Sequence, residues 1–385
     1  MRVFSRPVPL LTAAIGVIGA NSLVLPPIAP AVAADLTTEV ATILRAAAAY
    51  GAGTALSALL LAPRADVVGS DRVLRNASLL LILALVLSAL APNGYVLMLG
   101  QALAGLCAGV ALPSIYSLAA QVAPTGQEKK TISRVLTGWT LSLIGGVTLS
   151  AVIADQLGWR AVYGLMAGLT IVIWLCLRLC DMRAEKLSSR PTSPFTALRV
   201  PGIVRGLFSN AMLMLAFNGA YIFMGAHVVE NMQLSTSATG VITLLYGLGF
   251  ALAVAFNRYL EMMTLRRLGL FAFSGLSVTY LLMDHLSMSF ALLLPISVVW
   301  GVFQHFALNL VVDRLTSLDP AQRGAIMGLN SAVTYLTVMS GAILYRLPYE
   351  YGGLALCLAF SALFAAIAAV EAYWPQRLKT YSAAE

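Results

Sequence analysis

The sequence predicts an all-α membrane protein with twelve transmembrane helices, and three observations point to this fold class. Hydrophobic residues make up 59% of the 385-residue chain and charged residues only 10%, against about 45–50% and about 25% in soluble globular proteins. Apolar stretches that approach the ~20 residues of a spanning helix recur along the whole chain. Lysine and arginine collect in alternate loops between these stretches. The composition excludes an ordinary cytosolic enzyme, a disordered chain and a disulfide-stapled secreted domain.

The predicted spans fall into two groups of six. The first group lies near residues 10–34, 40–62, 76–91, 94–122, 132–154 and 161–179. The second lies near residues 203–229, 238–257, 268–283, 287–312, 324–345 and 353–374. The third and ninth spans are short. We therefore expect two pseudo-symmetric halves, with an N-terminal half at residues 1–179, a polar cytoplasmic connector at 180–202, and a C-terminal half with a short cytoplasmic tail at 203–385.

The basic residues predict the topology. Of the 24 lysines and arginines, 21 fall on one side of the predicted membrane, Arg160 and Arg346 fall on the other, and Arg45 lies inside the second span. This positive-inside pattern predicts an even number of spans with both termini in the cytoplasm. The net charge of +8 forms no clustered arm or stripe, so we expect no nucleic-acid partner.

The N-terminus has an alternative interpretation as a cleavable signal peptide, because a basic start precedes an apolar run and an alanine-rich stretch before Asp35. The apolar run is longer than a signal-peptide core and contains three prolines, and cleavage would break the charge alternation. A first transmembrane helix is therefore the favoured interpretation.

Several stretches carry a family pattern. Residues 25–36 read Leu-Pro-Pro-Ile-Ala-Pro-Ala-Val-Ala-Ala-Asp-Leu, and residues 61–72 read Leu-Ala-Pro-Arg-Ala-Asp-Val-Val-Gly-Ser-Asp-Arg. Residues 101–105 read Gln-Ala-Leu-Ala-Gly, and residues 323–336 read Arg-Gly-Ala-Ile-Met-Gly-Leu-Asn-Ser-Ala-Val-Thr-Tyr-Leu. Together with a glycine-rich fifth span, they resemble the major facilitator superfamily, in particular its bacterial drug- and sugar-efflux (arabinose-type) proton-driven permeases. The family pattern has an arginine where this chain has Gln101, and several other motif positions also differ.

The resemblance implies a major facilitator fold, in which two halves rock about a substrate site at the midplane. It assigns Asp66, with Gly69 and Arg72 beside it, to a gate at the cytoplasmic surface; the alternative is a solvated loop whose charges only obey topology. Small residues in the fourth and fifth spans suit close helix packing, and some helices would also slide there during transport. The packing glycines that we single out are Gly105, Gly145 and Gly146.

Polar and aromatic side chains inside the spans suggest the lining of a substrate cavity. In the resembled family, spans 1, 4, 7 and 10 line it, and most of the candidates lie on these spans. Taken singly, such a residue is more often a hydrogen-bonding contact between helices. As a group without net charge, they suit a neutral, amphipathic or weakly charged organic substrate. The candidates are Asn21, Gln101, Tyr116, Trp139, Asn218, Tyr221, Tyr246, Trp300, Gln304, Asn330 and Tyr335.

His305 is the clearest titratable residue well inside a predicted span. Because histidine changes charge between pH 5 and 8, it is the candidate for carrying a coupling proton. The alternative is a neutral hydrogen-bonding group within the bundle. The four cysteines have no metal-ligand spacing, and we expect neither a metal nor a cofactor.

The sequence therefore predicts a secondary active transporter of the bacterial inner membrane that exports a small organic molecule by alternating access, with proton exchange as the candidate form of coupling. Its expected partners are the substrate, membrane lipids and protons, and we expect a monomer. A uniporter and a non-transporting sensor or scaffold with a degenerate transporter fold remain alternatives. An enzyme is not expected, because no cluster of His, Asp, Glu or Cys has a catalytic spacing. No Walker A pattern occurs, which argues against ATP as the energy source.

Overall fold

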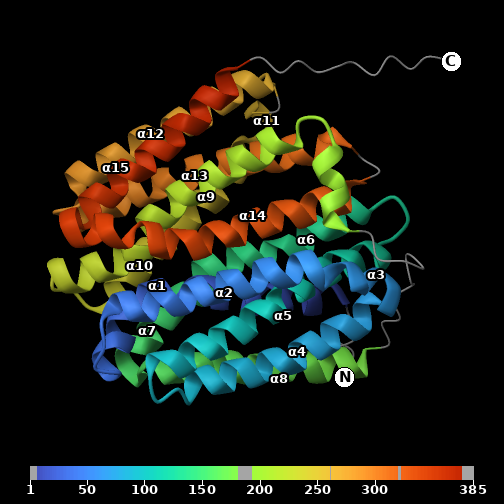
Figure 1. The fold of residues 1–385 in the computed structure, drawn as a ribbon, viewed down its shortest axis with the longest axis horizontal. Helices are drawn as coiled ribbons and strands as arrows, with labels where there is room; N and C mark the ends of the chain where they lie inside the picture. Colours follow the sequence, from blue (N-terminus) through green and yellow to red (C-terminus); the bar gives the residue numbers. More distant parts are fainter. Residues whose placement is uncertain (1–6, 181–192, 261, 320–321, 375–385) are drawn as a thin grey trace.

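The computed structural model describes residues 7–180, 193–260, 262–319 and 322–374, and these form a bundle of long helices with no strand among them (Figure 1). An apolar chain in lipid must satisfy its backbone hydrogen bonds internally, and a helix does so within one segment. Residues 181–192 of the expected connector lie outside the described residues.

The first group of helices runs from α1 to α8. The π-helical turn η2 joins α6 to α7, so that the three form one continuous span. The elements are α1 (Pro7–Asp35), α2 (Val40–Leu60), η1 (Ala62–Arg64), α3 (Ala65–Val68), α4 (Ser70–Ala89), α5 (Gly94–Gln121), α6 (Glu128–Leu141), η2 (Ser142–Val147), α7 (Thr148–Leu157) and α8 (Trp159–Leu179).

The second group runs from η3 to α15. Its first long helix, α9, continues through the π-helical turn η4. The elements are η3 (Pro194–Arg199), α9 (Ile203–Ala226), η4 (His227–Asn231), α10 (Thr236–Leu252), η5 (Ala253–Phe256), α11 (Asn257–Leu260), α12 (Leu265–Leu286), α13 (Phe290–Leu318), α14 (Arg323–Leu344) and α15 (Arg346–Tyr373).

Among the described residues, eleven helical stretches are long and apolar enough to cross a membrane. The remaining long helix, α12, corresponds to the short ninth predicted span. It carries Arg266 and Arg267 in its first turn and Asp284 and His285 in its last, which lowers its mean hydropathy. Its 22 residues nevertheless measure about 33 Å, as long as the hydrocarbon core is thick. With α12 included, the described residues form the twelve spans that the sequence predicts.

Each group is held together by its own set of helix contacts. In the first, α5 packs against α2 and α4, and α4 packs against α8. In the second, α13 packs against α10 and α12, and α15 packs against α9 and α12. The two groups meet where α14 packs along α2, α10 along α7 and η2, and α9 along α1.

Glycines allow the closest approaches, and corresponding helix pairs of the two groups use them in the same way. A Cβ at Gly105 of α5 would collide with the carbonyl oxygen of Tyr50 in α2, and one at Gly301 of α13 with the carbonyl oxygen of Tyr246 in α10. In lipid, such backbone contact replaces water exclusion as the source of helix association. Direct contact of the two backbones is therefore part of each group's core.

The two glycines of the π-helical turn differ from each other. A Cβ at Gly146 would lie 2.9 Å from the Cβ of Ala20 in α1, so this glycine lies at a helix crossing. Gly145 is exposed, and a Cβ there would meet nothing within 4 Å. The packing role predicted for Gly145 is therefore wrong, because the wider π-helical turn directs this position away from α1.

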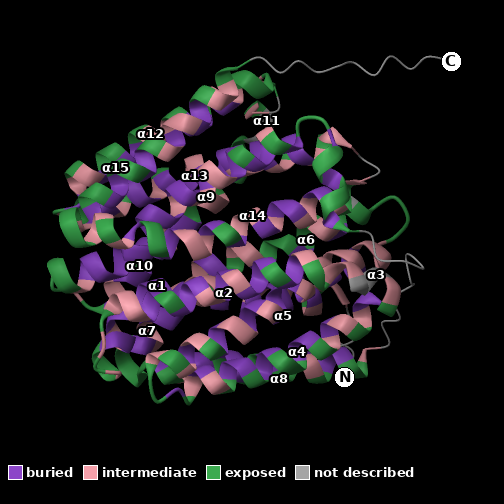
Figure 2. Cartoon of the chain, in the orientation of Figure 1, coloured by how far each residue is buried: buried purple, intermediate pink, exposed green. Residues whose placement is uncertain are grey.

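Burial follows the same arrangement (Figure 2). Buried residues concentrate along the interior helices, whereas large apolar side chains are exposed on the outer ones, as with Leu83 of α4, Val172 of α8, Leu282 of α12 and Leu363 of α15. So much exposed apolar surface would aggregate in water but is matched to lipid tails. The outer faces therefore contact the membrane.

We predict that Gly105→Ala destabilises the protein by ~1–3 kcal/mol, because the added methyl group must push α5 away from the backbone of α2. Thermal unfolding of the purified protein in detergent measures the effect. Gly168→Ala is the matched control, since Gly168 is an exposed helical glycine whose Cβ would meet nothing within 4 Å. Equal unfolding temperatures for the two variants would contradict the prediction.

Candidate functional site

The two ends of the bundle differ in charge. One end of the bundle, on the right of Figure 1 where α3 lies, is called the basic end. Arg72, Arg205, Arg314 and Arg323 lie on helices near this end. The other end, which we call the far end, carries the turn between α7 and α8 with Arg160.

Close contacts between the two groups gather at the middle and the far end. The Ser237 hydroxyl of α10 donates a 2.7 Å hydrogen bond to the Asp155 carboxylate of α7. The Thr148 hydroxyl donates to the Gly240 carbonyl oxygen, 3.2 Å away. At Gly225 of α9, a Cβ would lie 2.6 Å from the carbonyl oxygen of Pro26 in α1. The far end is therefore closed in this structure.

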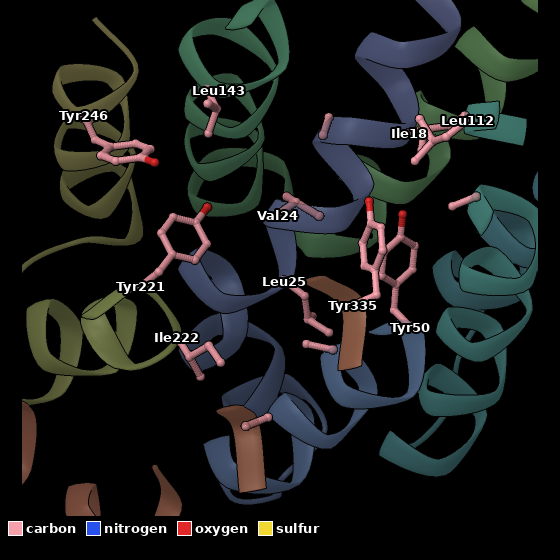
Figure 3. Close-up of a cluster of buried hydrophobic side chains, with 14 of the residues drawn as sticks. Ile18, Val24, Leu25, Tyr50, Leu112, Leu143, Tyr221, Ile222, Tyr246 and Tyr335 are labelled. Carbon is pink, nitrogen blue, oxygen red and sulfur yellow. The ribbon is translucent and has the colours of Figure 1, made fainter. Parts of the chain in front are cut away.

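Tyrosines from both groups surround α1 at mid-height (Figure 3). The Tyr221 hydroxyl of α9 donates a 2.8 Å hydrogen bond to the Leu23 carbonyl oxygen of α1. On the other side of α1, the rings of Tyr50 in α2 and Tyr335 in α14 meet edge to face with centroids 6.1 Å apart. Of the predicted cavity residues, Tyr221 and Tyr335 thus lie where the two groups meet.

The predicted cavity residues of the first group lie between α1, α5 and α6. The Asn21 side-chain nitrogen is 3.4 Å from the Gln101 Oε1 atom, and the Gln101 Nε2 donates to the Ser88 hydroxyl at 3.0 Å. The Trp139 indole N–H donates to the Tyr116 hydroxyl at 3.3 Å. The structure therefore brings the four predicted residues into two hydrogen-bonded pairs, with Gln101 bridging three helices.

An aromatic cluster occupies the corresponding part of the second group. Tyr246 and Trp300 have ring centroids 4.4 Å apart, and Phe217 packs on both as well as on Tyr221. The Trp300 indole N–H donates to the Tyr280 hydroxyl at 3.0 Å, and Trp300 is only 1% exposed. Trp300 is thus an anchor of the cluster, and the sequence analysis missed its partners Phe217 and Tyr280 because an aromatic residue in an apolar span carries no distinctive pattern.

Gln304 and His305 follow one turn further along α13, and both are buried. The Asn309 side-chain nitrogen is 2.7 Å from the His305 Nε2 atom, and the His305 ring meets the edge of Phe250 at a centroid distance of 4.7 Å. His305 therefore lies inside the second group, between α13 and α10.

The remaining predicted amides join α9 to α14. The Asn218 side chain donates a 2.9 Å hydrogen bond to the Thr337 carbonyl oxygen. Asn210, which the sequence analysis did not single out, donates to the Thr334 hydroxyl at 2.9 Å and contacts the carbonyl oxygen of Asn330 at 3.3 Å. These contacts hold two helices of the same group together.

Several of these buried polar side chains keep an unused acceptor. Among the described residues, the side-chain oxygens of Asn21, Gln304 and Asn330 are buried and have no hydrogen-bond partner. Buried acceptors are nearly always satisfied by protein, water or a ligand. The three lie on α1, α13 and α14, away from the ends of those helices, so both groups offer unsatisfied acceptors inside the bundle.

The predicted gate residues lie at the basic end around the start of α4. Gly69 precedes this helix with φ +105°, a conformation that favours glycine, and Arg72 is exposed. The side chain of Asp66 lies outside the described residues. The neighbouring Asp71 pairs with Arg75 at 2.9 Å within the same helix.

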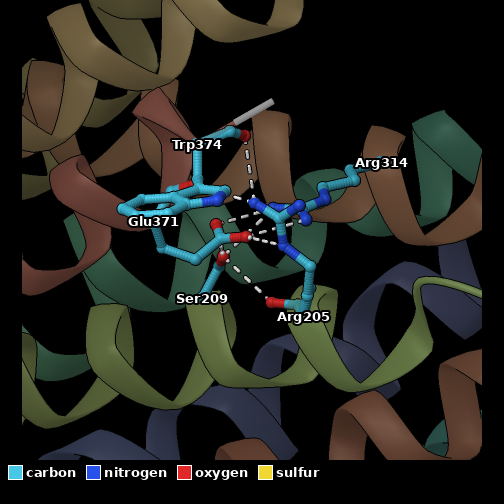
Figure 4. A network of polar contacts seen from close by, with 5 residues as sticks. All are labelled: Arg205, Ser209, Arg314, Glu371 and Trp374. Carbon is cyan, nitrogen blue, oxygen red and sulfur yellow. Dashed lines mark hydrogen bonds and ion pairs between the residues drawn. The ribbon is translucent and has the colours of Figure 1, made fainter. Parts of the chain in front are cut away.

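A charge network at the basic end of the second group joins three helices (Figure 4). The Glu371 carboxylate of α15 accepts hydrogen bonds from Arg314 of α13 at 2.8 and 2.9 Å, from the Arg205 Nε of α9 at 2.7 Å, and from the Ser209 hydroxyl at 2.6 Å. The Glu371 and Arg314 side chains are only 11% and 10% exposed. Bidentate, charge-assisted bonds of this kind are strong and directional.

From the sequence alone, Arg205 and Arg314 count only as charges that set the topology. The structure adds a second role, because both lie within helices and converge on one carboxylate. The three charged residues are 57 to 166 positions apart in the chain, and no local spacing indicates their contact.

Comparison with known proteins agrees with the fold. The sequence pattern of the Major Facilitator Superfamily matches residues 10–342. The chain is 26% identical to the uncharacterized MFS-type transporter YwfA of Bacillus subtilis (94% of this chain, 91% of the relative), and 27% identical to a probable sugar efflux transporter of Pasteurella multocida (74% and 71%). The crystal structure of a bacterial homologue of the human lysosomal transporter Spinster, inward-facing and unoccupied, superposes with a TM-score of 0.76 at 14% identity over 96% of both chains.

The twelve spans of the described residues, in two packed groups with exposed apolar outer faces, define a multi-pass membrane protein, and the family match makes it a transporter. The chain belongs to the major facilitator superfamily.

We predict that Glu371→Gln destabilises the protein by about 3 kcal/mol, because it leaves two arginines around a neutral side chain in a poorly hydrated site. Thermal unfolding in detergent measures the change. Glu350→Gln is the matched control, since its pair with Arg346 is exposed and adds little to stability. Equal effects of the two substitutions would show that the network does not stabilise the bundle.

Proposed function

We propose that this protein is a secondary active transporter of the bacterial inner membrane that exports a small, uncharged or weakly charged organic molecule by alternating access, in exchange for protons. The single observation that carries the proposal is that buried amide oxygens without a partner, among them those of Asn21, Gln304 and Asn330, lie on helices of both groups. A hydroxyl- or amide-bearing substrate would satisfy such acceptors.

The closed far end supports alternating access. The contacts described between the groups are glycine crossings, the Tyr50–Tyr335 ring contact and three hydroxyl hydrogen bonds, all of which can break without unfolding either group. The moving bodies in this proposal are residues 1–179 and 203–385, linked by residues 180–202. With the basic end in the cytoplasm, as the positive-inside pattern predicts, this structure has its periplasmic end closed.

The polar groups around the middle favour a neutral substrate. Amides, tyrosine hydroxyls and aromatic rings of both groups lie there, and a sugar or a small aromatic compound uses such contacts. The Pasteurella relative is named a probable sugar efflux transporter, which makes sugars the first substrates to test. Transport by a single chain is part of the proposal, because each chain contains both groups.

Export is tested by expressing the protein in an efflux-deficient bacterium and measuring the accumulation of labelled sugars, drugs and small metabolites, with and without a proton uncoupler. We expect at least one compound to accumulate less in expressing cells, and the uncoupler to abolish the difference. Equilibration that ignores the uncoupler would identify a uniporter. An unchanged accumulation of every compound would favour the non-transporting sensor or scaffold.

In the same assay, His305→Gln tests the coupling proton. We expect the variant to lose uphill export and to keep substrate exchange down a gradient, because glutamine retains hydrogen bonding but cannot change charge. Wild-type uphill export by His305→Gln would remove His305 from the coupling mechanism and leave the assignment of the exporter itself intact.

A crosslink across the far end tests the motion. In a variant without native cysteines, we predict that Asp155→Cys with Ser237→Cys forms a disulfide on oxidation and lowers export more than tenfold, and that reduction restores export. These side chains are in hydrogen-bond contact between the groups. The matched control is Asp35→Cys with Arg160→Cys, an ion-paired position within the first group. Full export by the crosslinked Asp155–Ser237 variant would exclude opening of the far end as a transport step.

A further inference from the structure

A cavity of about 280 Å³ lies beside the charge network, at the basic end of the second group. Its inner wall consists of the buried residues Ser209, Phe273, Leu310, Val311 and Arg314. Its mouth consists of the exposed residues Thr264, Leu265, Arg266 and Trp374. It is bounded by α9, α12, α13 and α15, away from α1 and from the region where the two groups meet.

The charged residues that line this cavity are both arginines, Arg314 at its inner wall and Arg266 at its mouth. Arg314 is buried and held in place by its bonds to Glu371 and Ser209. The Arg266 guanidinium is held 4.2 Å above the ring of Tyr373. Two positioned guanidinium groups suit the oxygens of a phosphate group.

The rest of the cavity wall is mostly apolar. Phe273, Leu310, Val311 and Leu265 line it together with Ala372. A free phosphate ion would lose part of its water shell against these side chains, which offer no hydrogen bonds in its place. An amphiphile would place its phosphate on the arginines and its carbon chain against the apolar wall.

The location of the mouth indicates where this amphiphile comes from. Trp374, Tyr373 and Leu265 are exposed around it, at the ends of two outer helices whose exposed surface further along is mostly apolar. Aromatic residues at helix ends mark the level of the lipid headgroups. A phospholipid of the surrounding leaflet therefore reaches the mouth without leaving the membrane.

We propose that this cavity binds the headgroup phosphate and glycerol of an anionic phospholipid. Basic pockets between transmembrane helices recognise such headgroups. The bound lipid bridges α12, through Arg266, to α13, through Arg314, and so reinforces the network on Glu371. The site is separate from the proposed substrate path and does not depend on the proposed export.

Native mass spectrometry of the delipidated protein in a neutral detergent, titrated with phosphatidylglycerol, tests the proposal. We expect phosphatidylglycerol to bind at least fivefold more tightly than phosphatidylethanolamine. Arg266→Gln should weaken phosphatidylglycerol binding about fivefold, because this is the contribution of one arginine to the binding of an anionic lipid. Arg267→Gln, the neighbouring exposed residue outside the cavity, is the matched control and should change binding less than twofold.

Three outcomes would overturn the proposal. They are equal binding of the two lipids, equal losses for Arg266→Gln and Arg267→Gln, and displacement of phosphatidylglycerol by millimolar inorganic phosphate, which would identify a site for the free ion. Because Arg314 supports the fold, its role is tested by Arg314→Lys, which keeps the charge. We expect the unfolding temperature of this variant to stay close to that of wild type, and its binding of phosphatidylglycerol to be weaker.

Discussion

This structure depends on one constraint, which is that helix backbones must approach each other closely within the lipid hydrocarbon. Lipid tails offer the helices no hydrophobic reason to associate, so contact area and interhelical hydrogen bonds must supply the stability. Gly105 against Tyr50 and Gly301 against Tyr246 bring the backbones of paired helices into direct contact. Larger side chains at these crossings would separate the helices and leave the buried polar groups between them without partners.

The same constraint produces the pseudo-symmetry of the two groups. The pair α2–α5 in the first and the pair α10–α13 in the second use a glycine on one helix against a tyrosine carbonyl on the other. Contacts between the groups repeat the scheme, since Gly51 of α2 meets α14 and Gly247 of α10 meets η2. Close packing at these crossings needs few specific bonds, as the proposed alternating access requires of this interface.

The polar groups, in contrast, differ between the two halves. Where the family pattern has an arginine, Gln101 of the first group makes neutral hydrogen bonds to Asn21 and Ser88. The second group instead concentrates charge at its basic end, where Glu371 is surrounded by Arg205 and Arg314. A network of buried charges is rigid because any loosening exposes an unpaired ion to a poorly hydrated site. The second group is therefore fixed at one end by charge and along its length by packing.

The sequence by itself determined the class of fold, because hydrophobic length and the alternation of basic residues are local properties of the chain. It also identified the family, and most of its predicted polar residues, such as Asn21, Gln101 and His305, do lie inside the bundle. Only the tertiary structure decided which residues meet. In the structure, Gly145 lies away from any helix contact, and Asn218 makes a hydrogen bond that joins α9 to α14. The structure also brings Arg205, Arg314 and Glu371 together. Such contacts depend on how helices rotate and cross, and an apolar span with nearly uniform hydrophobicity around its axis does not encode its own rotation.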